Sequence, residues 1–599
     1  MPPVNAVPST PGSRLPIWRV LTVAVLLALI LFVVDLGSIG LVDETPPLFA
    51  AAARQMAESG DWLIPQVNGL PRYDKPPLVY WLMAVFYRLP AQPLWDPLGS
   101  WSAALPSALA SGSVVLLLSL LMAWWDRRLW LLAPLLWGLS PLVMVWSRIG
   151  VSDALLTALL TGALLFSWLR VACTRWPWWP TWVLLALAIL TKGPVSMAVF
   201  ALTWSGFLLM HGRRAVSMTT WLSKRLRLLP GLLLCSLIAL PWYLAVALRD
   251  GTAFVESFFG YHNLQRFTQV VNHHHSPWWF YAPLLILASL PWSAALVLAL
   301  GRSLIQSAQL ARIDSPKSLP QFCSCWLLAV LLLFSLSATK LPSYWLPATP
   351  AAALLVATVA RHSDPFSRWA IRLGAITTLL MAALLVCSSR WLALVDDPEL
   401  VGLPAVLDRL WVVPIAVGLL LVGGCLCLLQ LGRSPRNAML AVQLSWLLLV
   451  PFVWWPLLRV GDRLRSQPLR AMAAEVTQRH PPDQPLVMLG LIKPSLQFYA
   501  RAPVAYEGLS AQAQVNLHDR LLRDARVRVA DADRRLLVVA PLHLEERRSW
   551  SGMLSPLQAQ HGRYGLWWLD LQALKRRVAT LQRDEGLRPT WQQPRPERF

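Results

Sequence analysis

Ionisable residues recur at the ends of long apolar segments in this sequence of 599 residues. Such a residue is costly beside hydrocarbon unless it is paired or used, so each is a functional candidate. Carboxylates can remove a proton from an acceptor hydroxyl, and cations can hold a phosphate. Together they suit the displacement of a lipid phosphate from a sugar carbon, because cations stabilise the charge that the leaving phosphate gains. The candidates are Asp43, Glu44, Asp74, Lys75, Arg148, Asp153, Lys192, His262, Arg266 and Lys340.

Long apolar runs must supply the helices that position these residues. Hydrophobic residues make up 56% of the chain and charged residues 14%, and the two kinds are massed separately. A run of about 20 residues is long enough for a helix to cross roughly 30 Å of hydrocarbon. The sequence therefore predicts a polytopic, all-α membrane protein. About thirteen spans are expected, near residues 17–40, 101–123, 129–147, 152–172, 177–191, 194–210, 228–248, 278–300, 322–338, 344–360, 370–389, 411–431 and 438–458.

The distribution of basic residues gives this series of spans an orientation. Arg127, Arg128, Arg213 and Arg214 are among the basic residues that fall in alternate loops, as the cytoplasmic side requires. With the N-terminus in the cytoplasm, all the candidate residues reach the external face. The formal net charge of +22 is thus a topology signal. No nucleic-acid partner is expected, since the tail after Arg459 has no binding motif.

The chain is expected to divide into a membrane domain and an external C-terminal domain. Residues 1–458 form the membrane domain, and its first external loop, 41–100, contains two short helical patterns, Thr45 to Ser59 and Lys75 to Leu89. Both are too short to span and are expected to lie along the membrane surface. Residues 459–599 are predicted to form a small external α/β domain. Its strand-like runs are Leu486 to Leu489, Leu536 to Ala540 and Leu566 to Leu571.

Several short blocks between residues 40 and 350 form a recognisable series. They are Asp43-Glu44, Ser59 to Pro65, Asn68 to Leu70, Tyr73 to Pro77, Arg148 to Leu155, Leu190 to Pro194, His262 to Phe267, and Lys340 to Tyr344 followed by Leu346, Pro347 and Pro350. In this order the blocks resemble the ArnT-like and protein O-mannosyltransferase-like enzymes of the GT-C superfamily. Each block is weak alone, whereas the series is specific.

The resemblance implies a GT-C fold with thirteen spans, surface helices in the first loop and a C-terminal external domain. It also implies inverting transfer from an undecaprenyl- or dolichyl-phosphate sugar, without a nucleotide sugar and without an obligatory metal. Asp43 occupies the family's acidic catalytic position. Lys75, Arg266 and Lys340 with Tyr344 occupy positions associated with the carrier phosphate.

Several of these residues also have a plain structural explanation. Asp43 and Glu44 could cap the helix that follows them, because acidic side chains favour helix N-termini. Lys75 could be a membrane-surface anchor. Asp153 could pair with Arg148 at the end of a span, or it could orient the first loop as part of the site. We interpret Asp43 and Asp153 as catalytic candidates, and Lys75 and Glu44 as substrate-binding candidates.

The histidines raise the question of a metal. His273, His274 and His275 are adjacent, which is poor spacing for one ion, and no cysteine or paired carboxylate accompanies them. A loop in contact with solvent or headgroups explains them better. No cofactor is expected to be required, with a divalent metal as the minor alternative. His262 and Asp74 are interpreted as substrate-binding candidates.

The sequence thus favours a glycosyltransferase at the outer face of a bacterial inner membrane. Its expected partners are a polyprenyl-phosphate-linked sugar, membrane lipids and an acceptor that is a glycolipid or a protein, with a lipid A-like glycolipid favoured. One departure concerns the sugar, since Arg72, Tyr73, Asp74 and Lys75 stand where the lipid A aminoarabinose transferases usually have two aromatics, Glu and Lys.

Two alternatives to this function remain open. The first is an enzyme of the protein O-mannosyltransferase type. The second is a transporter or flippase of a lipid-linked anion, which would also need cations near the membrane surface. A transporter is expected to carry charges near the middle of its spans and to show repeat symmetry, and this sequence has neither pattern.

Overall fold

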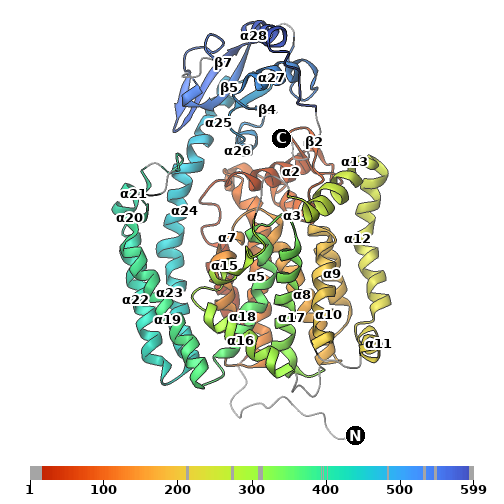
Figure 1. The fold of residues 1–599 in the computed structure, drawn as a ribbon, viewed down its shortest axis with the longest axis vertical. Helices are drawn as coiled ribbons and strands as arrows, with labels where there is room; N and C mark the ends of the chain where they lie inside the picture. The colour runs from red at the N-terminus through yellow and green to blue at the C-terminus, as the bar shows by residue number, and fades with distance from the viewer. Residues whose placement is uncertain are drawn as a thin grey trace.

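The computed structural model describes residues 16–210, 215–270, 276–307, 314–392, 394, 397–400, 402–481, 484–530, 534–544 and 549–592. Helices dominate, and most run side by side in a bundle (Figure 1). At one end of the bundle, helices of the first loop lie beneath a smaller part that holds a β-sheet. A large apolar cluster fills the bundle, and the sheet has a separate cluster on each face.

Seven helices of the described chain are long and apolar enough to cross a membrane, so this is a multi-pass membrane protein. In its most apolar stretch, 83% of α8 is buried inside the protein, whereas the value is 33% for α12, α19 and α22. The first therefore lies within the bundle, and the other three face lipid. The seven are α5 (Ser100–Trp125), α8 (Ser152–Ala172), α12 (Leu228–Asp250), η4 with α17 (Pro316–Leu336), α19 (Pro365–Val386), α22 (Val412–Leu431) and the helix Pro435–Arg479.

Three further apolar segments form shorter helices. They are α1 with η1 (Ile17–Val33), α9 (Trp179–Lys192) and α10 (Val195–Met210). The turn between α9 and α10 contains Gly193, whose φ of +80° is a conformation that glycine adopts without strain. Pro194 follows it, and the close return brings Lys192 and the start of α10 to the same end of the bundle.

Three other expected spans are interrupted, bent or change helix type. Proline lacks a backbone N–H and resists the interior of a helix, so helices restart at it. The segment 129–147 becomes α6 (Leu132–Gly138) and α7 (Pro141–Trp146), and 344–360 becomes the 3₁₀ segment η5 (Pro342–Ala348) followed by α18 (Thr349–Val359). The pair α15 (Tyr281–Ala288) and α16 (Ser293–Gln306) is bent by 109°.

The first loop contains the two expected short helices, α2 (Thr45–Ser59) and α3 (Leu78–Tyr87). The second begins three residues later than predicted, because residues 75–77 form its approach. Between the two helices, β1 (Gln66–Val67) and β2 (Leu70–Pro71) make a tight antiparallel hairpin. The buried face of α2 packs on α3 and on α26 (Pro494–Ala500) of the C-terminal part.

The last spanning helix does not stop at the expected boundary of residue 458. From Pro435 it runs through α23 (Pro435–Leu449), η6, α24 (Trp455–Gly461) and η7 into α25 (Gln467–Arg479) without a break. Figure 1 shows this helix rising out of the bundle and ending under the sheet. It therefore joins the membrane helices to the C-terminal part as one continuous rod.

The C-terminal part contains a five-stranded sheet in the order β4-β3-β5-β7-β6. The pairs β3–β4 and β3–β5 are parallel, and the pairs β5–β7 and β6–β7 are antiparallel. Helices α25 and α26 contribute to the apolar cluster on one face, and α27 and α28 to that on the other. The elements are β3 (Leu486–Leu489), β4 (Val504–Glu507), β5 (Arg535–Pro541), β6 (Ala559–His561), β7 (Tyr564–Asp570), α27 (Ala511–Arg523) and α28 (Leu571–Asp584).

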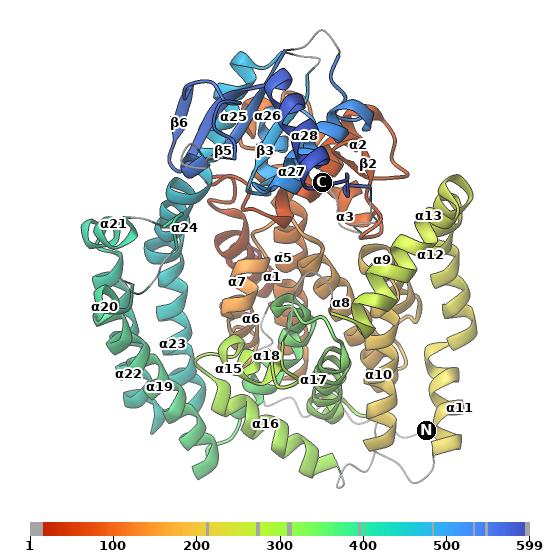
Figure 2. The same cartoon turned by 45° about the horizontal axis from the view of Figure 1, so that its top comes forward.

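The remaining helices are short connections. Between α10 and α12 lies α11 (Ala215–Leu226), and between α12 and α15 lie α13 (Thr252–Val255), η2 (Glu256–Gln265) and α14 (Arg266–Thr268). The connections between α19 and α22 are α20 (Ser388–Leu392) and α21 (Leu403–Arg409), and α4 (Gln92–Trp95) precedes α5. The turned view in Figure 2 shows α13 and the segment after it reaching from α12 toward the other helices.

Candidate active site

A cavity of about 1720 Å³ lies at the end of the bundle that carries the first loop. Its wall combines the first loop, the start of α8, the turn between α9 and α10, the segment η2–α14 and the 3₁₀ segment η5. Eight of the nine residues that the sequence assigns to a site line this cavity, although they come from five separate stretches of the chain. They are Asp43, Glu44, Asp74, Lys75, Asp153, His262, Arg266 and Tyr344.

Asp74 is the centre of a polar cluster in the first loop. The guanidinium of Arg72 lies 2.7 Å from its carboxylate, and the Tyr80 hydroxyl on α3 donates to the other oxygen at 2.8 Å. The ammonium of Lys75 lies 3.6 Å from the same carboxylate. The Arg72 guanidinium also lies 5.5 Å above the ring of Phe49 on α2, a cation–π distance. Asp74 is therefore held by the protein and is not available as a free base.

The charges in this cluster shift each other's pKa values. Burial raises the pKa of Asp74, but Arg72 and Lys75 outweigh it and hold that pKa below its usual range. Burial lowers the pKa of Lys75 to about 8, helped by Arg266 and Lys192 and opposed by Asp74. A phosphate entering here would meet a surplus of positive charge, since several cations act on one another across the cavity.

His262 on η2 is neutral in this surrounding. Burial, together with Lys75 and Arg266, lowers its pKa to about 3 despite the opposing charge of Asp74. Its Nδ1 is buried and has no hydrogen-bond partner among the described residues. A neutral imidazole can donate one hydrogen bond and accept another, so His262 can serve a substrate hydroxyl or phosphate oxygen.

Asp153 pairs with Lys192 and not with Arg148. The Lys192 ammonium lies 2.6 Å from the Asp153 carboxylate and 5.1 Å from the ring centre of Tyr344. Arg148 instead donates to the carbonyl oxygens of Leu31 at 3.2 Å and Val34 at 2.9 Å, at the end of the first helix. The suggested Arg148–Asp153 pair is therefore wrong, because the turn after α9 brings Lys192 closer to the start of α8.

Lys340 is the one residue of the nine that is absent from the described wall of the cavity. The backbone next to Lys340 lies close to Arg266, since the amide of Thr339 donates to the Arg266 carbonyl at 3.4 Å. Its ammonium, however, turns back to the carbonyl of Ser337 at 2.6 Å, and the residue is 7% exposed. In this arrangement Lys340 closes its own turn and supports the segment beside Arg266.

Asp43 lines the same cavity and is held by the C-terminal part of the chain. The amide of Ser495 donates to one carboxylate oxygen at 3.0 Å, and the Ser495 hydroxyl donates to the other. Burial raises the pKa of Asp43, while these bonds and Lys493 partly oppose it. Neither acidic residue caps α2, since Glu44 stands at its N-cap and makes no side-chain capping bond.

No group of three or more histidine, cysteine, aspartate and glutamate side chains in the described parts of the chain is arranged to hold a metal ion. His273, His274 and His275 lie outside the described residues. Within the cavity wall, Asp74 is already occupied by its cationic neighbours. The described site thus presents cations and hydrogen-bonding groups to a substrate.

Three contacts of the site were not predicted from the sequence. Tyr80 holds Asp74 from α3, Ser495 holds Asp43 from 452 positions away, and the Tyr73 hydroxyl binds the carboxylate of Asp250 at the end of α12. A polar tip on an otherwise apolar helix was a usable signal for Tyr80. No local pattern connects Ser495 with Asp43, because only the folded chain brings them together.

Two family models match separate parts of the chain. The model described as dolichyl-phosphate-mannose-protein mannosyltransferase matches residues 74–244, and that described as the C-terminal domain of cyanobacterial RgtA-type glycosyltransferase matches residues 479–585. The first match contains Asp74, Lys75 and Tyr80, the Asp153–Lys192 pair and the helices α3, α8 and α9. The second match covers the part of the chain that contains the sheet.

Among curated proteins, the chain resembles undecaprenyl phosphate-alpha-4-amino-4-deoxy-L-arabinose arabinosyl transferases. It is 31% identical over 360 residues to that of Pseudomonas aeruginosa strain UCBPP-PA14, which is 57% of this chain and 59% of the relative. For the protein of Erwinia tasmaniensis, the values are 30% over 325 residues, 52% of this chain and 53% of the relative. The matched regions thus span between half and three fifths of these relatives.

The fold also matches solved structures along nearly the whole chain. The crystal structure of ArnT from Cupriavidus metallidurans bound to undecaprenyl phosphate has a TM-score of 0.72 with 23% identity, covering 92% of this chain and 98% of that one. Its apo form has the same TM-score with 22% identity. The chain thus shares its fold with ArnT along nearly its whole length, and two of its segments match family models of glycosyltransferases.

Proposed function

We propose that this protein transfers a sugar from an undecaprenyl-phosphate carrier to an acceptor at the outer face of a bacterial inner membrane. The observation that carries the proposal is the single cavity that joins a group of cations to a carboxylate. The relatives described above, named as transferases that use an undecaprenyl-phosphate sugar, support the same donor. A lipid A-like glycolipid is the favoured acceptor, as the resemblance of the sequence blocks implies.

The proposed reaction is a displacement with inversion at the sugar carbon. An acceptor hydroxyl oxygen attacks the anomeric carbon, and its proton passes to the carboxylate of Asp43. The bond from that carbon to the phosphate oxygen breaks, and undecaprenyl phosphate leaves with one more negative charge. Lys75 and Arg266 stabilise this added charge, and His262 supplies a neutral hydrogen bond.

The apolar walls of the cavity suit two lipid substrates. Beside the cations, the wall includes Phe267 and the α17 side chains Leu333 and Phe334, against which an isoprenoid chain can lie. The wall also includes Trp454 and Leu458, from the helix that rises into the C-terminal part. We infer that the carrier occupies the first region and that a glycolipid acceptor approaches Asp43 along the second.

The membrane arrangement follows from this assignment. We propose thirteen passes, in which the shorter and broken helices join the seven long ones, with the N-terminus in the cytoplasm. The first loop, the cavity and residues 459–599, as an α/β domain, then lie on the periplasmic side. The positions of the basic loops and the placement of α2, α3 and the sheet at one end of the bundle support this orientation. No required cofactor is proposed.

A pH dependence follows from Lys75. Because its pKa lies near 8 in the empty site, the charged form that binds phosphate is lost as pH rises through that value. The affinity for undecaprenyl phosphate is expected to fall about tenfold per pH unit above pH 8. Binding measured between pH 6.5 and 9.5 checks this, and Lys75→Arg should shift the decline upward. An affinity that stayed flat through pH 9.5 would contradict the role of Lys75.

The proposed function is tested in cells with and without the gene. Mass spectrometry of envelope lipids should show a sugar-modified lipid A species only when the intact protein is present. A modified protein fraction with unchanged lipid A would instead favour a transferase of the protein O-mannosyltransferase type. If neither fraction changed in mass, the proposed transfer would be wrong and a transporter of a lipid-linked anion would gain support.

A further inference from the structure

The carboxylate of Asp43 receives hydrogen bonds on both of its oxygens from one residue of the C-terminal part, Ser495. The same carboxylate lines the cavity that contains the cations. Each carboxylate oxygen has two acceptor positions, so one remains on each oxygen for a substrate proton. Ser495 therefore fixes the direction in which Asp43 faces without occupying all of its capacity.

We propose that Ser495 is a positioning residue for Asp43, and that the contacts around Lys493 and Asn68 hold it in place, so that the C-terminal part controls the catalytic carboxylate. This inference rests on the proposed function, in which Asp43 removes the acceptor proton. It assigns the C-terminal part a task in the reaction beyond covering the cavity.

The first anchor is the carboxylate of Glu399, in the connection between α20 and α21. Lys493, two residues before Ser495, lies 2.8 Å from it, and Arg465 on the rising helix lies 2.7 Å from it. Arg563 lies at 3.8 Å, and the Tyr564 hydroxyl donates at 3.2 Å. The Glu399 side chain is 7% exposed. A buried carboxylate with these partners ties the start of α26 to a loop of the membrane part.

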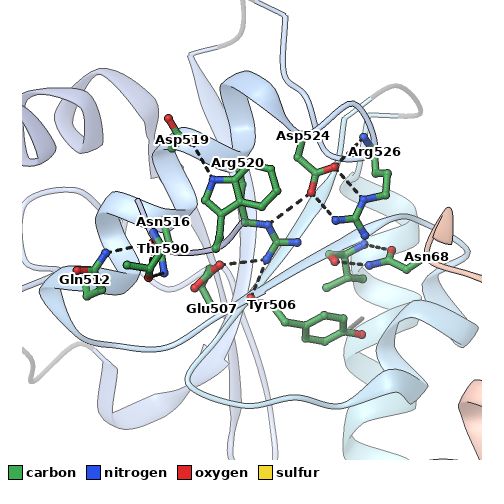
Figure 3. A network of polar contacts seen from close by, with 12 residues as sticks. Asn68, Tyr506, Glu507, Gln512, Asn516, Asp519, Arg520, Asp524, Arg526 and Thr590 are labelled. Carbon is green, nitrogen blue, oxygen red and sulfur yellow. Dashed lines mark hydrogen bonds and ion pairs between the residues drawn. The ribbon is translucent and has the colours of Figure 1, made fainter. Parts of the chain in front are cut away.

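The second anchor joins β4 to the hairpin of the first loop. The Asn68 side chain donates to the carbonyl of Val504 at 2.8 Å and accepts from its amide at 2.9 Å (Figure 3). Gly69, the next residue, faces Arg526, and an added Cβ would lie 3.3 Å from that side chain. Arg526 is itself fixed by Asp524 at 2.5 Å. The C-terminal part thus binds the loop that carries Asp74 and Lys75.

A third contact lies on α26 itself. The Tyr499 hydroxyl accepts from the amide of Leu41 at 2.9 Å and donates to the carbonyl of Leu98 at 3.2 Å. Leu41 is two residues before Asp43, so the same short helix binds the chain on which Asp43 stands. Together the three contacts leave little freedom for Ser495 to move away from Asp43 while the C-terminal part stays docked.

The electrostatic surroundings of Asp43 give this arrangement a measurable consequence. Burial raises its pKa, and the bonds from Ser495 and the charge of Lys493 oppose that rise. The other titratable groups that act on it are Glu44, Tyr499, Tyr506 and Tyr564, and these are neutral or acidic near pH 7. Loss of Ser495 or Lys493 therefore raises the pKa of Asp43. A base works only when ionised. As pH falls, the variants should therefore lose activity at a higher pH than the unmodified protein does.

The test compares the pH dependence of sugar transfer by the full chain in proteoliposomes. The probes are undecaprenyl phosphate 4-amino-4-deoxy-L-arabinose and lipid A. Ser495→Ala is expected to move the acid limb of kcat/KM upward by about one pH unit, which is about tenfold in rate below the limb. Lys493→Gln should move it in the same direction, and Ser495→Thr, which keeps the hydroxyl, should restore the original position.

The matched control is Ser510→Ala. Ser510 caps α27 by accepting from the amide of Ala513 at 3.2 Å, so its loss removes a serine hydroxyl from the same part of the chain. This variant should keep the acid limb of the unmodified protein. Binding of undecaprenyl phosphate should be equal in all four variants, because none of them alters the cation cluster.

The outcomes separate this inference from the proposed function. If the unmodified protein transfers sugar and Ser495→Ala and Lys493→Gln keep its acid limb, the positioning role is wrong while the transferase function stands. A fall in rate without a change in the limb would likewise assign Ser495 a structural role only. If the unmodified protein transfers no sugar to any acceptor, the proposed function itself fails. Lys493→Gln leaves the serine intact, so the test survives if Ser495→Ala does not fold.

Discussion

An Asp43→Asn variant is expected to lose sugar transfer by about a thousandfold while it still binds undecaprenyl phosphate. The amide has nearly the shape of the carboxylate, and its oxygen can still accept a hydrogen bond from Ser495, so the surroundings should survive. It cannot take a proton from an acceptor hydroxyl. Transfer is measured as modified lipid A per unit time, and carrier binding as the dissociation constant of undecaprenyl phosphate.

The control for Asp43 is Asp61→Asn in the same loop. Asp61 accepts from the amide of Leu63 at 3.0 Å and pairs with Arg249 at 2.9 Å, outside the wall of the cavity. This variant should retain transfer. Equal activity of Asp43→Asn and the unmodified protein would remove Asp43 from the mechanism, because no isosteric neutral side chain can replace a general base.

A Lys75→Gln variant is expected to weaken binding of undecaprenyl phosphate by about 10- to 100-fold. A hydrogen bond from a cation to a phosphate is stronger than one from a neutral group, and Lys75 lies among cations that already repel one another. The fold should tolerate the change, since Asp74 keeps Arg72 at 2.7 Å and Tyr80 at 2.8 Å. Titration with undecaprenyl phosphate at pH 7 measures the loss.

Arg88→Gln is the comparison for Lys75. Arg88 is an exposed cation that follows α3 in the same loop, so the variant removes an equal charge away from the cavity. It should bind the carrier as the unmodified protein does. A Lys75→Gln variant with unchanged affinity would show that the carrier phosphate lies elsewhere, and the cation cluster would then need another explanation.

Local sequence patterns were enough for several elements. The helix α2 has the bounds Thr45–Ser59 expected from its amphipathic pattern, because Pro46 and Pro47 suit a first turn and Gly60 follows its end. The strand β3 has the expected bounds Leu486–Leu489, since a short apolar run between turn residues allows little else. Composition alone also established a multi-pass membrane protein, which rests on helix length and on the cost of burying charge.

Sequence patterns were less informative about where a helix is interrupted and where it ends. The runs 129–147 and 344–360 are apolar enough to suggest one span each, yet the first is split into α6 and α7, and the second begins as a 3₁₀ segment before α18. A hydropathy average hardly registers a single proline, whereas a proline interrupts the hydrogen bonds of the helix backbone. The helix ending at Arg479 shows the opposite case, because its apolar stretch ends well before the helix does.

The site was predictable as a set of residues but not as a set of pairs. Eight of nine candidates line the cavity because charge at the external ends of apolar runs must lie near one membrane face. Which cation meets which carboxylate depends on helix packing. Arg148 is a possible partner of Asp153 because it is near in sequence, but the structure pairs Asp153 with Lys192, which is 39 positions away. The contact between Asp43 and Ser495 has no local signal at all.

The residues that replace the usual motif of the lipid A aminoarabinose transferases now have a structural explanation. Arg72, which stands in place of an aromatic residue, packs its guanidinium over Phe49 and neutralises Asp74. Tyr73 binds Asp250 and contacts Phe254 edge-on at 5.6 Å. Arg72 and Asp74, the two positions that depart from the motif, thus pair with each other, and the change in sequence does not remove a cation from the cavity.

The most direct test of the central claim is the stoichiometry of the reaction in a purified system. Proteoliposomes that contain the full chain are supplied with undecaprenyl phosphate 4-amino-4-deoxy-L-arabinose and lipid A, and both products are quantified. One undecaprenyl phosphate is expected to be released for each lipid A modified, and neither product is expected with Asp43→Asn. Donor that crosses the bilayer while lipid A stays unmodified would contradict the account and indicate transport.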